Sequence, residues 1–214
     1  YSNLKKELAA KNAQLVAVSK TKPVAAIREL YDLGHRDFGE NYVQELVEKQ
    51  PQLPDDIRWH FIGHLQSNKV KYIAPFVHLI HGIDSLKLLK EVNKQAQKVN
   101  RVIAVLLQVH IAREETKFGL DEVELQQLLQ TPELAELKHV QIRGLMGMAS
   151  FSDDTELVRK EFRFLKELFD RYVPYKKANC QFTDLSMGMS GDYKLALEEG
   201  SNMVRIGSLL FGSR

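Results

Sequence analysis

The sequence is poor in cysteine and lacks any long apolar run, and both scarcities restrict the kind of protein it can be. Cys180 is the single cysteine among 214 residues, so no intrachain disulfide is possible and a reducing compartment is expected. No uninterrupted apolar run is long enough to span a bilayer, and the opening YSNLKKELAAKNAQ lacks the apolar core of a signal peptide. We therefore expect a cytoplasmic protein that does not enter the membrane. Because the chain begins with Tyr1 rather than methionine, we expect the natural N-terminus to lie upstream.

The sequence also lacks an excess of charge of one sign. The 30 Lys and Arg residues are nearly balanced by 28 Asp and Glu residues, which leaves a formal net charge of +2. The segments 45–49 and 159–167 mix both signs in the pattern of solvent-exposed helix faces. A nucleic-acid partner, which would require a basic patch or stripe, is therefore not expected.

Internal repeats, low-complexity stretches and interdomain linkers are missing as well. A hydrophobic content of 44% and a charged content of 27% are ordinary for a soluble globular protein. A length of 214 residues is within the range of one α/β domain, so we expect a single domain over residues 1–214.

The sequence instead contains short apolar or β-branched runs that alternate with amphipathic stretches. Helices are predicted between these runs, for example from Pro23 to Leu33, from Ser85 to Val99 and from Thr155 to Tyr172, with Gly34 and Gly200 at helix ends. N-caps are expected within Asp84-Ser85 and within Ser152-Asp153-Asp154. The predicted strands are residues 15–20, 37–41, 58–63, 79–84, 101–111, 140–148, 184–189 and 203–208.

Eight strand–helix units of this kind favour one architecture. Parallel strands need crossover connections, which the intervening helices supply. Eight units in about 200 residues predict a (β/α)8 TIM-type barrel of the smallest size. An open, doubly wound sheet remains the alternative, because periodicity alone does not distinguish the two.

Polar residues or glycines end seven of the eight predicted strands, at the face where such barrels carry their sites. We therefore expect this face to hold a small polar ligand. The residues are Lys20, Asn41, Gly63, Asp84, His110, Ser190 and the pair Gly207-Ser208.

Lys20 is the most informative of these residues. Side chains alternate along a strand, so Lys20 shares one face with Val16 and Val18, and it points into the barrel if they do. Burial lowers the pKa of a lysine, and a neutral amine attacks carbonyl carbon to form a Schiff base. The alternatives are a lysine that reaches solvent at the strand end, and Lys22, which precedes Pro23 and is expected in the loop.

The stretch 185–208 carries the signals of an anion site. Ser186, Gly188, Ser190 and Gly191 crowd a predicted strand-to-helix junction, and a helix starting near Gly191 would direct its N-terminus at an anion. Gly207 and Ser208 repeat this arrangement one unit later, where barrels commonly bind phosphate. Arg205 shares a strand face with Gly207, and a structural role at the barrel rim is its alternative.

Five segments together resemble the YggS/PROSC family of pyridoxal phosphate (PLP) homeostasis proteins. They are VSKTKP at 18–23, FGENYVQE at 38–45, WHFIGHLQSNK at 59–69, LSMGMSGD at 185–192 and VRIGS at 204–208. The resemblance implies a PLP-binding barrel like the N-terminal domain of alanine racemase, with Lys20 as the Schiff-base lysine. It also implies that Ser190, Gly207 and Ser208 bind the phosphate with Ser186 nearby, that Arg205 faces the pyridine nitrogen, and that Asn41 and His60 line the ring.

The resemblance further implies a function in PLP homeostasis, in which the chain carries and buffers PLP reversibly and passes it to apo-enzymes. We expect a monomer. The alternative is a PLP-dependent racemase or lyase of low activity. Alanine racemase has a further β-rich domain and a tyrosine base contributed by its dimer partner, whereas only Lys20 is evident in this chain, so robust catalysis is not expected.

Two further signals are set aside. His60 and His64 have a spacing that suits zinc on a helix, but Gly63 and the strand pattern break that geometry, so no metal is expected. Lys117 in EETKFGL is expected to be a solvated loop lysine, with a second PLP contact as the alternative.

Overall fold

The structure of this protein is a computed structural model, and it describes residues 1–114 and 118–212. Lys117 lies outside the described residues. Within them, no helix is both long enough and apolar enough to cross a membrane.

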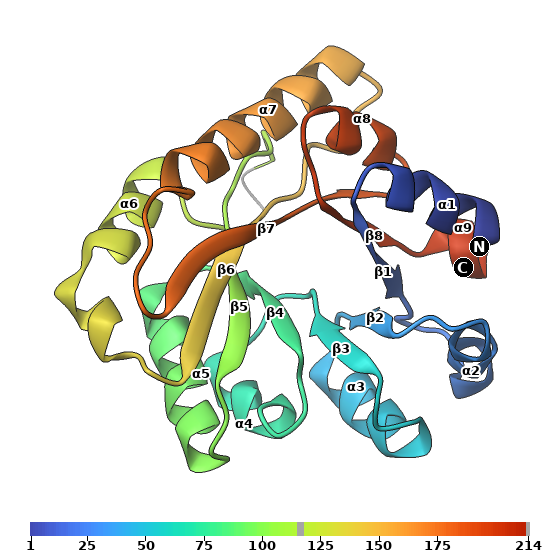
Figure 1. Cartoon of the computed structure of the whole chain (residues 1–214), viewed down its shortest axis with the longest axis horizontal. Coiled ribbons are helices and arrows are strands. Elements are labelled where there is room, and N and C mark those ends of the chain that lie inside the picture. Colours follow the sequence, from blue (N-terminus) through green and yellow to red (C-terminus); the bar gives the residue numbers. More distant parts are fainter. Residues whose placement is uncertain (115–117, 213–214) are drawn as a thin grey trace.

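Eight parallel strands of the described chain close into a barrel in sequence order, as predicted (Figure 1). The closing pair is β1 with β8, in register from Gln14 opposite Met203 to Ala17 opposite Ile206. The open-sheet alternative is therefore excluded. The strands are β1 (Gln14–Val18), β2 (Asp37–Glu40), β3 (Arg58–Phe61), β4 (Leu79–Ile83), β5 (Ile103–Gln108), β6 (Val140–Met146), β7 (Cys180–Met189) and β8 (Met203–Ile206).

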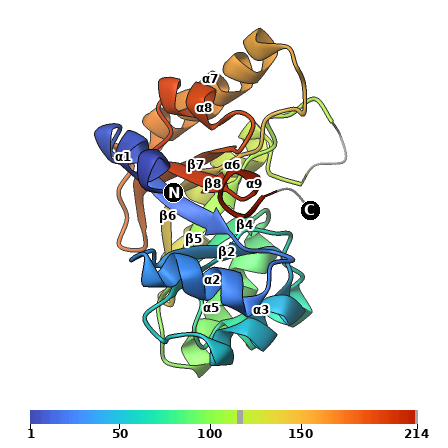
Figure 2. The same ribbon diagram turned by 90° about the vertical axis from the view of Figure 1, so that its right-hand side faces the viewer.

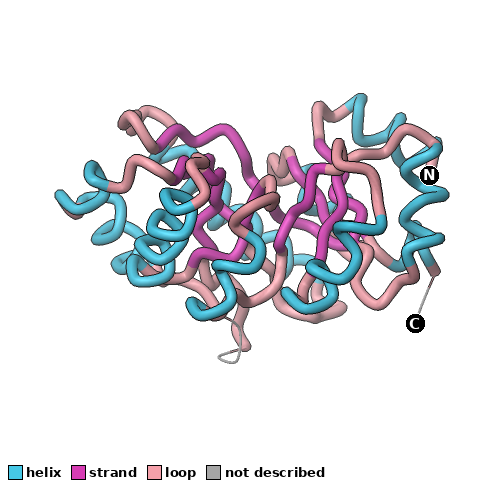
Figure 3. Tube along the Cα trace, turned by 90° about the horizontal axis from the view of Figure 1, so that it is seen from below, coloured by secondary structure: helices cyan, strands magenta, loops and turns pink. Residues whose placement is uncertain are grey.

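Helices surround the barrel, with the strands inside and the helices outside (Figure 3). They are α1 (Ser2–Ala10), α2 (Val24–Asp32), α3 (Val43–Lys49), α4 (Val70–Ile73), α5 (Leu86–Lys98), α6 (Glu122–Gln130), α7 (Thr155–Tyr172), α8 (Tyr193–Glu198) and α9 (Ser208–Phe211). The predicted caps are confirmed, because Ser85 accepts from the backbone of Leu88, and Asp154 accepts from Glu156 and Leu157. Gly34 and Gly200 follow helices with φ of 90° and 97°, which glycine adopts without strain.

The strands separate two apolar layers. Outward-facing residues such as Phe38, Trp59 and Ile80 pack under the helices in the large core. Inside the barrel, a smaller cluster contains Val16, Leu79, Leu106, Met146 and Met203. Val16 therefore faces the barrel interior. The prediction that Lys20 points into the barrel depended on this orientation.

Two charged residues depart from the expected solvent-exposed helix faces. Lys49 and Glu161 are each only 7% exposed, although segments 45–49 and 159–167 were expected to face solvent. Lys49 bonds Glu40 of β2, and the carboxylate of Glu161 accepts from both the backbone N–H and the hydroxyl of Ser150. Partners on the preceding strand or loop, 9 and 11 residues away, therefore pair these two charges. A buried charge is stable only when it is paired.

Candidate functional site

A cavity of about 560 Å³ opens at the carboxyl ends of the strands, the face predicted for the site. Its walls come from the loops that follow β1, β6, β7 and β8. In the side view, β1 runs toward the side on which α9 lies, so the carboxyl end of β1 and the helix that follows β8 are on the same side of the barrel (Figure 2). The lining residues are Val18, Lys20, Thr21, Lys22, Ser150, Phe151, Ser152, Asp153, Val158, Met189, Ser190, Gly191, Asp192, Gly207, Ser208 and Gly212.

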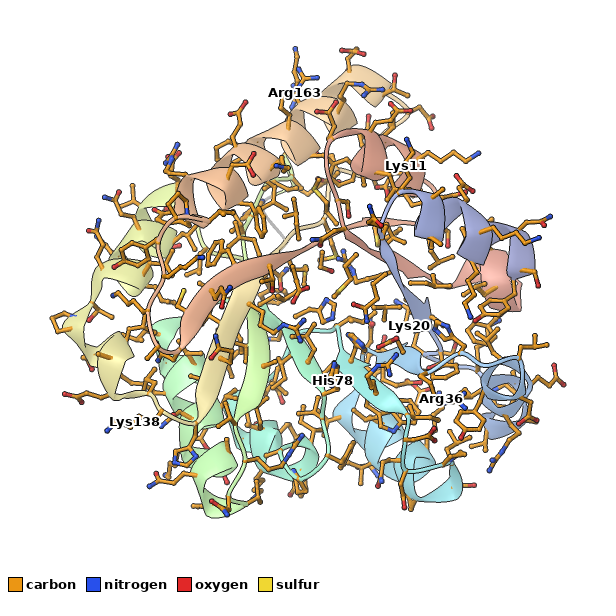
Figure 4. All side chains as sticks on the ribbon, in the orientation of Figure 1. Lys11, Lys20, Arg36, His78, Lys138 and Arg163 are labelled. Carbon is orange, nitrogen blue, oxygen red and sulfur yellow. The ribbon has the colours of Figure 1, made fainter. Side chains whose placement is uncertain are left out.

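Lys20 is half-buried in this wall, two residues after the end of β1 (Figure 4). Val18, on the same strand face, also lines the cavity. The amine of Lys22 donates to the carbonyl oxygens of Phe211 and Gly212 at 3.2 Å each. Lys22 thus joins the β1 loop to the end of α9.

A buried ionic cluster fixes the residue before Lys20. The hydroxyl of Ser19 donates to Glu40 Oε1 at 2.6 Å, and the amine of Lys49 donates to the same oxygen and to the backbone oxygen of Ser19, both at 2.8 Å. Glu40 is fully buried, and burial raises the pKa of its carboxyl group although the bonds from Lys49 and Ser19 oppose that shift. The cluster lies on the helix side of the barrel, behind the cavity wall.

The residue after Lys20 is fixed in the same way. The backbone N–H of Thr21 donates to Glu45 Oε1 at 2.5 Å, and that oxygen also accepts from Lys49 at 2.6 Å. Thr21 has a φ of 63°, a left-handed conformation that is unfavourable for a β-branched residue by about 1–3 kcal/mol. Lys20 therefore lies between two anchored neighbours, in a backbone held in a strained shape.

Beside the Lys20 loop, the ends of β7 and β8 bring together three of the predicted phosphate residues. Ser190, Gly207 and Ser208 line the cavity, and the hydroxyl of Ser190 accepts from the N–H of Gly207 at 3.2 Å. α9 begins at Ser208, so its first N–H groups have no acceptor within the helix. Gly191 has nothing within 4 Å of the position where a Cβ would project, so a side chain there would enter open space. The expected helix near Gly191 is α8, which begins two residues later at Tyr193.

Arg205 and Ser186 lie below the cavity, inside the barrel. Arg205 is 3% exposed and donates to the hydroxyl of Ser186 at 2.6 Å and to the backbone oxygen of Gly147 at 3.2 Å. Burial lowers the pKa of Arg205 to about 10, and the negative charge of Asp192 opposes that shift. Arg205 therefore remains a cation that can only donate hydrogen bonds.

His60 and Asn41 are not among the residues that line the cavity. His60 is fully buried, and its ring nitrogens bond His81 at 2.9 Å and Asp37 at 3.0 Å. The side-chain oxygen of Asn41 is buried without a hydrogen-bond partner, and the backbone oxygen of Asn41 is only 2.2 Å from the position of a Cβ on Gly63. Only glycine at position 63 permits this approach of the β2 and β3 loops.

His60 and His64 do not form a pair. His64 is stacked on Phe118 and lies near Asp84, whereas His60 lies within the barrel. Asp37, His60 and His78 do offer ligand atoms within 4.8 Å of one another. However, the guanidinium of Arg58 already donates to both carboxylate oxygens of Asp37, which makes this cluster a poor cation site.

Sequence reasoning missed Glu40, Glu45 and Lys49 around the lysine loop, and Asp37 and His81 inside the barrel. Strand alternation offered one signal, because Glu40 is next to Gly39, whose Cβ position would contact Val16 in the interior. Glu40 must therefore face the helices. No local pattern indicates that Lys49 reaches Glu40 or that His81 reaches His60.

The donor set fits PLP. The cavity is lined by an amine from the loop after β1 and by hydroxyl and backbone N–H donors from the ends of β7 and β8, with open space at Gly191 and a cation beneath. These are the groups needed for an aldehyde, a phosphate and an aromatic nitrogen that accepts a hydrogen bond. The volume is within the usual range of small-molecule sites.

Known proteins resemble this chain over its whole length. The family described as alanine racemase, N-terminal domain, matches residues 1–214. A protein of Aquifex aeolicus named pyridoxal phosphate homeostasis protein is 45% identical over 203 residues, which cover 94% of this chain and 87% of that protein.

Solved structures give the same result for the fold. PipY of Synechococcus elongatus is 38% identical, with a TM-score of 0.89 without PLP, covering 99% of this chain and 97% of that one. The structure of PipY with PLP bound matches this chain with a TM-score of 0.84, covering 94% of this chain and 93% of that one. Alanine racemase of Bartonella henselae, solved with covalently bound pyridoxal phosphate, shares the fold at 20% identity and a TM-score of 0.71, covering 98% of this chain and 57% of that one.

Proposed function

This chain belongs to the alanine racemase N-terminal domain family and, within it, to the pyridoxal phosphate homeostasis proteins, and from this premise we propose that it binds PLP reversibly through Lys20 and buffers it. The observation that carries the proposal is the convergence of Lys20, Ser190, Gly207 and Ser208 on one cavity, with Arg205 beneath it. PLP, when bound, supplies an aldehyde carbon that an amine attacks and a ring that accepts electrons.

Each group of this chain has a defined part in the proposal. The amine of Lys20 forms the covalent link, and the anchored neighbours Ser19 and Thr21 hold its backbone at the cavity wall. Ser190, Gly207 and Ser208 bind the phosphate. Ser186 and Arg205 lie on the ring side of the site, with Asn41 and His60 farther from the cavity.

Arg205 favours carriage over catalysis. An arginine remains charged and has no acceptor, so a pyridine nitrogen that it bonds must itself accept and stays unprotonated. An unprotonated ring withdraws electrons less strongly, which weakens the chemistry of a racemase or lyase while leaving reversible binding intact.

The test is borohydride trapping with a peptide map. Wild-type protein incubated with PLP should give an absorbing adduct that borohydride fixes on the peptide containing Lys20. Lys20→Ala should lose the adduct. Lys138→Ala should retain it, because Lys138 is exposed, does not line the cavity and lies far from Lys20 in Figure 4. A Lys20→Ala protein that traps PLP at the wild-type level, or an adduct mapped to Lys22, would refute the assignment.

The further parts of the proposal concern partners and setting. We propose that the barrel acts as one monomeric domain in the cytoplasm and passes PLP to apo-enzymes. Loaded protein should reactivate a PLP-dependent apo-enzyme faster than free PLP at the same free concentration. Equal rates would refute delivery, and a dimer mass in solution would refute the monomer. Cα deuterium exchange in amino acids well above the rate with free PLP would instead favour a racemase or lyase.

A further inference from the structure

A continuous chain of side-chain hydrogen bonds crosses the interior of the barrel. It joins five residues on five strands: Asp37 on β2, His60 on β3, His81 on β4, Ser186 on β7 and Arg205 on β8. From Asp37, the successive distances are 3.0 Å to His60 Nε2, 2.9 Å from His60 Nδ1 to His81 Nε2, 3.0 Å from His81 Nδ1 to Ser186 Oγ, and 2.6 Å from Ser186 Oγ to Arg205. All five side chains are buried.

The Asp37 end of the chain is an acceptor. Burial alone would raise the pKa of Asp37, but hydrogen bonds from Arg58 and His60 outweigh it and hold the pKa well below its usual value. A carboxylate accepts only, so the Nε2 of His60 must carry a proton. At the other end, Arg205 donates only, so Ser186 must accept from it.

When His60 is neutral, these two ends determine the direction of every bond between them. A neutral His60 with a proton on Nε2 accepts at Nδ1, so His81 donates from its Nε2. His81 then accepts at Nδ1 from the hydroxyl of Ser186. Burial lowers the pKa of His81 well below its usual value, and the charge of Arg205 adds to that shift, so His81 carries one ring proton.

The reverse direction leaves a group unsatisfied. If His60 carried both ring protons, His81 would donate from Nδ1 to Ser186, whose oxygen already accepts from Arg205. The hydroxyl proton of Ser186 would then have no acceptor among the contacts of the described residues. An unsatisfied buried hydroxyl is costly, which favours the first arrangement.

We propose that Asp37, His60 and His81 are positioning residues, which orient the hydroxyl of Ser186 so that its lone pair holds Arg205 in place beneath the cavity. The anchored guanidinium, also bonded to the backbone oxygen of Gly147, presents its remaining N–H groups in one orientation. The inference rests on the proposed function, since the partner of those N–H groups is the ring nitrogen of PLP.

The first test needs no cofactor. Long-range ¹H–¹⁵N correlation spectra of the histidine rings in the protein without PLP should place the proton of both His60 and His81 on Nε2. Arg58, His78 and Asp192 are the other charged or titratable groups that act on the chain. Because the pKa of His81 is well below its usual value, spectra from pH 6 to 9 should show no change of tautomer in the His81 ring. A proton on Nδ1 of His81 would overturn the proposal.

The second test uses ¹⁵N-labelled PLP and a matched pair of serines. Ser186→Ala should shift the ring nitrogen from an unprotonated signal to one that titrates between pH 6 and 9, and should weaken PLP binding roughly tenfold. Ser186→Thr, which keeps the hydroxyl, should behave like the wild type. Ser201→Ala removes another buried hydroxyl between β7 and β8, one that bonds only backbone oxygens, and should leave the signal unchanged.

The outcomes separate the two proposals. A Ser186→Ala protein whose ring-nitrogen signal matches the wild type at every pH would overturn the positioning role. If Ser186→Ala does not fold, the wild-type tautomers and the Ser186→Thr spectra decide. A wild-type protein that takes up no PLP would refute the proposed function, and in that sample the His81 tautomer would still support or overturn the hydrogen-bond chain.

Discussion

At the scale of single residues, Lys49 shows how a charge behind the site can be required for the site. Its amine bonds Glu40, Glu45 and the backbone of Ser19, and Glu40 is fully buried. Because removal of one partner leaves a buried carboxylate unpaired, Lys49→Met should lower the free energy of unfolding by about 3–5 kcal/mol. Urea unfolding followed by far-UV circular dichroism measures this loss.

The control for Lys49 is an exposed lysine. Lys71→Met alters a lysine at the end of α4 that faces solvent and should change stability by less than about 0.5 kcal/mol. The double variant Glu40→Leu/Lys49→Met should recover part of the loss, because no charge is then left unpaired. Equal stabilities of Lys49→Met and Lys71→Met would contradict the role assigned to the ionic cluster.

The residue scale is also where sequence reasoning reached its limit. Lys20 could be placed from strand alternation, since Val16 and Val18 lie on its face and the alternation is local. The burial of Lys49 could not be predicted in this way. Glu45 and Lys49 are four residues apart, and this spacing is equally common on exposed helix faces. Likewise, His60 and His81 are 21 residues apart in sequence and meet only when β3 and β4 stand side by side.

At the scale of elements, α7 gives a measurable test of a local rule. The carboxylate of Asp154 accepts from the backbone N–H groups of Glu156 and Leu157, two donors that the first turn of a helix leaves unpaired. Asp154→Ala should therefore destabilise the protein by about 1 kcal/mol in thermal or urea unfolding. Asp153→Ala, one residue earlier and outside the cap, should cost clearly less; equal losses would contradict the capping role.

Elements were predictable where their signals are local. The caps at Ser85 and Asp154 were predictable because a short polar side chain before an apolar helical pattern is a local sequence signal. The start of β7 was missed, because it begins at Cys180 rather than at residue 184. Cys180 and Phe182 are buried, and Gln181 and Thr183 are exposed, but four residues at the end of a loop are too few to establish a period.

At the scale of the whole molecule, buried histidines make stability depend on pH. Burial is the main cause that lowers the pKa of His35, of His81, and of His78, the last to about 4. A histidine whose pKa is lower in the folded state contributes stability that is complete above the unfolded value of about 6.5 and is lost as the pH falls below it. The free energy of unfolding should thus decline between pH 6.5 and 5, by up to roughly 1.4 kcal/mol per pH unit for each histidine.

Urea unfolding at a series of pH values checks this slope. His78→Gln removes one contributing group and should flatten the decline between pH 6.5 and 5 relative to the wild type. A stability that rises as the pH falls through this range would show that the three histidines are not held in the neutral form.

Because β1 pairs with β8, the site can form only after both ends of the barrel have been synthesised. Lys20 is translated well before β8, and one edge of β1 pairs with β2 while the other has no partner until residues 203–206 have been made. Domains form as their chain becomes available, so a nascent barrel would expose its lysine to the cell as an ordinary amine while most of the chain is still being translated. Ser190, Gly207 and Ser208 follow β7 and β8, so cofactor capture would require that all eight strands of the barrel have been made.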